Sequence, residues 1–83
     1  MSLRKHYMTL CVRGNTEVTH ILKGNTLEIT FEQAKKGGFN TLVLDDKANI
    51  ISNQGFNNSD IVFFKDFLLR NIQVMYEEAR GEL

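Results

Sequence analysis

The C-terminal part of the sequence carries a long, uninterrupted helical pattern, and this feature constrains the fold more than any other. A capping residue, Asn58 or Ser59, precedes the pattern, Asp60 suits the positive end of the helix dipole, and Gly81 follows it. A helix over residues 59–80 is about 30 Å long at 1.5 Å per residue. Strands of the usual length of about five to six residues are shorter than this helix. We therefore expect part of the helix to extend beyond the sheet it packs on.

The predicted helix carries more apolar side chains than one sheet face can cover. One stripe has the spacing that packing on a sheet requires, and it consists of Ile61, Phe64, Leu68, Ile72, Met75 and Ala79. A second face lies nearly opposite this stripe and contains Phe63, Phe67, Arg70 and Val74, while Val62, Leu69 and Tyr76 lie on one flank. Aromatic side chains around an arginine are typical of the centre of a protein interface. We therefore expect the second face to bind a partner.

Two kinds of partner fit this second face, a second copy of the chain or another protein. Two-fold homodimers are the commonest oligomers, because they need only one self-complementary patch. The alternative is that the strands wrap around the helix within one chain, in which case Phe63 and Phe67 belong to the core.

The first half of the chain predicts a β-meander. Two stretches ten residues apart repeat a basic residue followed by Gly-Asn, first at Arg13 and again at Lys23. Gly-Asn accepts the positive φ of tight hairpin turns, and the flanking residues favour strands. Residues 7–31 should therefore form three antiparallel strands.

A short helical turn is expected next, over residues 31–36. Thr30 is placed to cap it, Gln33 to complete a capping box, and Gly37 or Gly38 to end it.

Two further strands, over residues 39–44 and 50–52, are expected to form a second hairpin. The predicted fold is therefore α+β: an antiparallel β-meander plus a second β-hairpin, about five strands in all, with a short helical turn and one long C-terminal helix packed on the sheet. We expect a single domain over residues 1–83, of which 1–6 form a flexible N-terminus.

Composition limits the cellular compartment and the kinds of binding partner that are expected. The ten basic and ten acidic residues cancel, so no long-range field attracts nucleic acid or an anionic membrane. The single cysteine, Cys11, cannot form the internal disulfide typical of small secreted domains, and no apolar run is long enough to span a membrane. We expect a cytoplasmic protein, and the absence of Pro and Trp with many Asn and Lys is typical of an AT-rich bacterial or phage genome.

A basic cluster gives an alternative function. Arg4, Lys5, Arg13 and Lys23 could gather at one end of the meander and contact nucleic acid. The chain would then be a nucleic-acid-associated or phage or mobile-element regulator, and its binding would weaken with salt.

The residues that could support catalysis or bind a metal are few. Cys11 and His20 lie on adjacent predicted strands, but as diagonal neighbours at best, and nothing marks an oxyanion hole. His6, His20 and Cys11 offer no closely spaced ligand pair for zinc. We expect no enzyme activity, no metal and no cofactor, but a small non-catalytic protein–protein interaction module that self-associates through its C-terminal helix.

Overall fold

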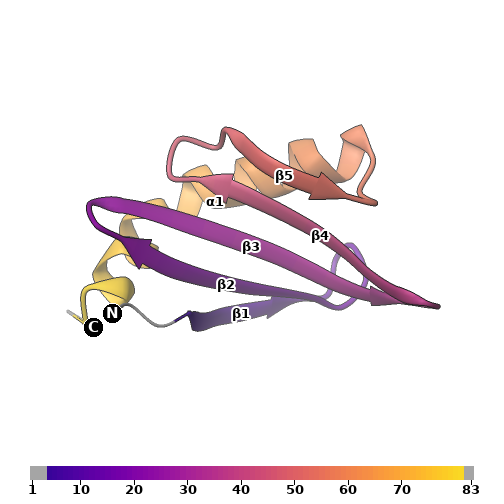
Figure 1. The fold of residues 1–83 in the computed structure, drawn as a ribbon, viewed down its shortest axis with the longest axis horizontal. Helices are drawn as coiled ribbons and strands as arrows, with labels where there is room; N and C mark the ends of the chain where they lie inside the picture. The colour runs from indigo at the N-terminus through magenta and orange to yellow at the C-terminus, as the bar shows by residue number, and fades with distance from the viewer. Residues whose placement is uncertain (1–3, 82–83) are drawn as a thin grey trace.

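The computed structural model describes residues 4–81 as a five-stranded antiparallel sheet followed by one long helix (Figure 1). The strands lie side by side in chain order, and their bounds are β1 (Lys5–Leu10), β2 (Thr16–Lys23), β3 (Thr26–Lys35), β4 (Gly38–Asp45) and β5 (Ile50–Gln54). The helix, α1, spans Asn58–Ala79. The predicted α+β fold is therefore confirmed in its five strands and its long C-terminal helix.

The two Gly-Asn turns differ in the structure. The second is a tight hairpin turn in which Lys23 pairs with Thr26 and Gly24 has a φ of +61°. The first belongs to a longer loop over residues 11–15, because β1 ends at Leu10, which pairs with Thr16. Only the second turn is the tight hairpin that the sequence pattern predicts.

The short helical turn expected over residues 31–36 is absent from this position, and that prediction is wrong. The segment is the second half of β3, where Phe31 pairs with Val18 on one side and Leu42 on the other. The local capping pattern favours a turn, but a strand here satisfies backbone groups on both sides of β3 and buries Phe31 completely.

Part of the N-terminal segment that was expected to be flexible belongs to the sheet. Lys5 and His6, expected within a flexible segment, are the first residues of β1 and pair with His20 and Thr19. The rest of the predicted flexible segment, residues 1–3, lies outside the described residues.

The helix begins one position earlier than expected, and its capping residue is Asn57. The backbone of Asn57 is extended, and its side-chain Oδ1 accepts a hydrogen bond from the backbone N–H of Asp60 at 2.9 Å. At the other end Gly81 adopts a φ of +77°, the left-handed conformation that commonly ends helices.

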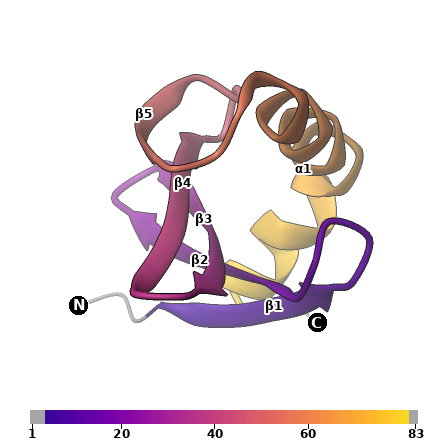
Figure 2. The ribbon, with the colours of Figure 1, turned by 90° about the vertical axis from the view of Figure 1, so that its right-hand side faces the viewer.

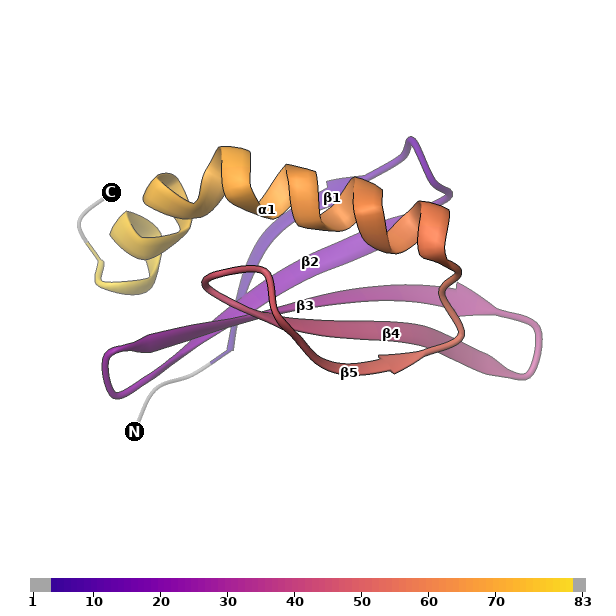
Figure 3. The same cartoon turned by 90° about the horizontal axis from the view of Figure 1, so that it is seen from above.

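The sheet curls around one side of α1, which runs along its inner face over β2 and β3 (Figures 2 and 3). Alternation along β2 and β3 directs Val18, His20, Ile29 and Phe31 to this face, and all four are buried. The predicted core stripe of the helix is confirmed, because Ile61, Phe64, Leu68 and Met75 are buried while Ile72 and Ala79 pack against the core.

Candidate functional site

Phe67, one of the two aromatic residues of the expected interface, packs mostly within the chain. Its ring centroid lies 6.2 Å from that of Tyr7 and 6.1 Å from that of Phe31, both in edge-on geometry. The Tyr7 hydroxyl also donates a hydrogen bond of 2.8 Å to Oδ1 of Asn71 on α1. Strand β1 therefore covers this side of the helix, as the wrapped alternative requires.

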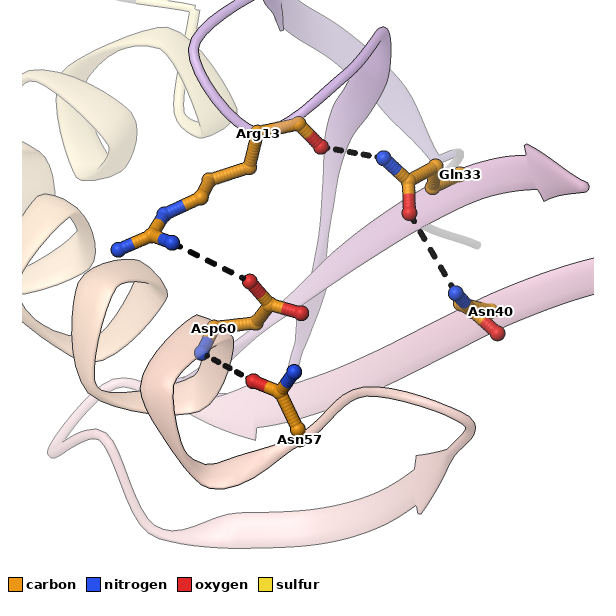
Figure 4. Close-up of polar contacts among 5 residues, drawn as sticks. All are labelled: Arg13, Gln33, Asn40, Asn57 and Asp60. Atoms are coloured by element: carbon orange, nitrogen blue, oxygen red, sulfur yellow. Dashed lines mark hydrogen bonds and ion pairs between the residues drawn. The ribbon is translucent and has the colours of Figure 1, made fainter.

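Phe63, the second aromatic residue, is also half-buried and packs against the core. Its ring lies edge-on to Phe64 at 5.6 Å, and the Arg13 guanidinium carbon lies 5.1 Å from the Phe63 ring centroid. A cation over an aromatic face is an attractive contact. The same guanidinium pairs with Asp60 at 3.7 Å, so the loop over residues 11–15 is attached to the first turn of α1 (Figure 4).

A network of side-chain amides holds that loop on the sheet (Figure 4). The Gln33 amide on β3 donates to the Arg13 carbonyl oxygen, and the Asn40 amide on β4 donates to Gln33 Oε1 at 3.4 Å. Two polar atoms at this network, Thr16 Oγ1 and Asn40 Oδ1, are buried and have no hydrogen-bond partner within the described part of the chain. The network fixes the loop that carries Arg13 over Phe63.

The other two residues of the expected interface are exposed. Val74 is 39% exposed, and the Arg70 side chain points into solvent, where its Nε lies 2.9 Å from Asp66 Oδ2. The structure therefore separates the four residues into two packed aromatic side chains and two exposed ones.

The most exposed apolar side chains of α1 lie on the flank formed by Val62, Leu69 and Tyr76. Val62 is 67% exposed and Leu69 is 56% exposed, and their seven-residue spacing places them on the same side of the helix. Tyr76 continues this row, and its hydroxyl donates to Asp46 Oδ2 in the connection between β4 and β5. The helical pattern identified the flank, but which side of α1 stays uncovered depends on how β1 wraps around it.

A second group of exposed apolar residues lies on and next to the edge strand β5. Ile50 and Ile51 are 47% and 50% exposed, and Phe39 near the start of β4 is 53% exposed. Ile50 pairs with the buried Leu44, yet it stays exposed because α1 lies over β2 and β3.

The basic residues do not gather into one patch. The Lys5 ammonium donates to the carbonyl oxygens of Glu78 and Ala79 at the end of α1, whereas Arg13 lies at its start. Lys23, at the β2–β3 turn, pairs with Glu28 at 3.3 Å.

The remaining predicted basic residue, Arg4, is exposed just before β1. Arg4, Lys5 and Lys23 thus lie toward one end of the sheet and Arg13 toward the other, and three of the four lie beside carboxylates or a helix C-terminus.

Cys11 and His20 also lie apart. Cys11 is exposed in the loop after β1, while His20 is buried and pairs with Lys5 at the opposite end of that strand. Within residues 4–81, no three His, Cys, Asp or Glu side chains are grouped in a way that could hold a metal ion. In the same part of the chain, no helix is both long and apolar enough to cross a membrane.

Comparison with known proteins gives no assignment: no family model, no curated protein and no solved structure matches the chain.

Proposed function

We propose that the chain is a small, non-catalytic protein–protein interaction module that self-associates through its C-terminal helix. The observation that carries the proposal is the exposure of Val62 and Leu69 on one flank of a helix whose core stripe is already buried. Burying apolar surface against a partner stabilises a complex by about 25 cal/mol for each Å² removed from water. The interface therefore centres on Val62 and Leu69.

A second copy is the partner that this row fits best. When two α1 helices pair antiparallel about a two-fold axis at Leu69, each Leu69 meets its equivalent and Val62 lies opposite Tyr76 of the second copy. Such pairing also places opposite helix ends side by side, which is favourable for their dipoles. The zero formal net charge of the chain removes long-range repulsion between copies.

Charged residues would form the rim of this interface. Arg70, expected at the centre of the face that contains Phe63, Phe67 and Val74, is neutralised by Asp66 on the same helix. An exposed ion pair of this kind contributes little binding energy, so the apolar row supplies most of it.

A reducing, cytoplasmic location is part of the proposal. Cys11 is exposed and is the only cysteine in the sequence. In an oxidising compartment it could link two copies covalently, and a reducing one keeps it as a free thiol.

The test is the solution mass of the protein by light scattering over a concentration series, in reducing buffer. The wild type should be a dimer, and the double variant Val62→Ser/Leu69→Ser should be a folded monomer because it removes apolar contact area without touching the core. Lys36→Ser, at an exposed position in the turn between β3 and β4, is the control and should remain dimeric. A wild type that is monomeric at every concentration, or a double variant that is still dimeric, would overturn the proposal.

A further inference from the structure

His20 is a buried imidazole beneath the last turns of α1. It lies on β2 between Lys5 of β1 and Ile29 of β3, and its side chain is fully buried on the helix side of the sheet. Among residues 4–81, neither ring nitrogen, Nδ1 or Nε2, has a hydrogen-bond partner. Most buried polar side chains in folded proteins are hydrogen-bonded, so this arrangement is unusual and calls for an explanation.

Three ionisable groups surround the imidazole. On α1, Glu78 Oε1 lies 4.0 Å from Nε2, and about one third of the Glu78 side chain is exposed. On β1, Lys5 binds the last carbonyl groups of the helix, and the Tyr7 ring centroid lies 6.1 Å from that of His20. On β3, the facing residue Ile29 carries no charge. Burial, and then Glu78, raises the pKa of Tyr7, so this phenol stays neutral at physiological pH.

The imidazole is therefore neutral in the packed structure near pH 7. Burial lowers the pKa of His20 and Lys5 lowers it further, while Glu78 and the residue's own backbone act in the opposite direction; the net shift is downward from 6.5. Protonation would create a buried cation with two N–H donors, and Glu78 is the one carboxylate within 4.0 Å of the ring among the described residues. Its hydration requires the overlying turns of α1 to move away from β2.

We propose that His20 makes the C-terminal turns of α1 a pH-sensitive latch, packed on the sheet while the imidazole is neutral and detached when it takes up a proton. In the detached state water reaches His20, which then binds a proton more readily than in the packed state. The open state gains population as the pH falls below about 6.5, by at most tenfold per pH unit for one proton. Above that pH both states are neutral at His20 and the latch is closed.

Amide hydrogen exchange, corrected for the intrinsic effect of pH, tests the latch on the full chain. Protection of residues 72–80 should stay constant between pH 7.5 and about 6.5 and then fall toward pH 5.0, by up to tenfold per pH unit, while protection of residues 61–68 changes much less. His20→Phe fills the same space without a titrating group and should remove the pH dependence of residues 72–80. Unchanged protection in the wild type, or the same pH dependence in His20→Phe, would overturn the proposal.

A second measurement keeps the test decisive if His20→Phe does not fold. An NMR titration of the wild type should give a pKa for His20 below 6.5, the ordinary value for histidine. Glu78→Gln removes the carboxylate that favours the charged imidazole, so it should lower the pKa of His20 in the packed state and increase latch opening at a given acidic pH. A pKa for His20 at or above 6.5, or an upward shift of this pKa in Glu78→Gln, would contradict the latch.

Discussion

The ammonium of Lys5, in the first strand, lies 3.2 Å from the carbonyl oxygen of Glu78 at the end of the last helix. The last turn of α1 contains no basic residue, so Lys5 supplies from β1 the positive charge that favours a helix C-terminus. Two segments 73 residues apart in sequence are joined by this contact.

Removing this charge should loosen the end of the helix. We expect Lys5→Met to lower the free energy of unfolding by about 0.3–1 kcal/mol, since the side chain is exposed and solvent screens the interaction. Urea denaturation at low and high salt would measure the effect, which should shrink in high salt. Lys23→Met is the control: it removes an exposed ion pair with Glu28 and should cost less than about 0.5 kcal/mol. If the two variants lose the same free energy of unfolding, the contact of Lys5 with the helix C-terminus stabilises the protein no more than an ordinary surface ion pair.

The helix N-terminus provides a test at two neighbouring asparagines. Asn57 accepts the Asp60 N–H, whereas Asn58 is the first helical residue and is exposed. Asn57→Ala should destabilise the protein by about 1 kcal/mol through loss of the cap, and Asn58→Ala should be nearly neutral. Thermal and urea unfolding of both variants measure the difference. The reverse order of stabilities would show that Asn58 caps the helix.

The two aromatic residues first assigned to an interface should behave as core residues. Phe67→Ser removes the edge-on contacts with Tyr7 and Phe31 and should lower the free energy of unfolding by about 2–4 kcal/mol. Val62→Ser, on the same helix but 67% exposed, should change the stability of the monomer by less than about 0.5 kcal/mol. Circular dichroism during urea unfolding, at protein concentrations below any dimerisation, separates stability from association. If Phe67→Ser is as stable as Val62→Ser, Phe67 does not contribute to the core.

Gly55 should tolerate substitution less well than Gly24, although both have a positive φ. An added Cβ at Gly55 would collide with the Asn40 side chain, while one at Gly24 would meet nothing within 4 Å. Gly24→Ala should therefore cost only the backbone strain of a left-handed alanine, about 1–2 kcal/mol. Gly55→Ala should cost about 1–3 kcal/mol more, because the strand β4 or the connection to α1 must shift. If thermal unfolding finds the two variants equally stable, Asn40 moves aside without cost.

Local patterns in the sequence were sufficient to predict much of the fold. The spacing of Ile61, Phe64 and Leu68 predicted the core face of the helix. This prediction holds because side-chain direction in a helix follows directly from backbone geometry. The turn at Gly24 was likewise predictable from the positive φ that it requires.

Contacts between distant segments determined the secondary structure and the burial of residues whose local pattern predicts something else. Residues 31–35 form a strand despite a capping pattern, because β2 and β4 offer hydrogen bonds on both sides. Phe63 and Phe67 pack inward because β1 and its loop wrap around α1 and bring Tyr7 and Arg13 onto them. The helical periodicity of a sequence shows how many faces of a helix are apolar. Which of these faces remains in solvent depends on how far the sheet curls, and only the contacts between segments far apart in the chain set that curvature.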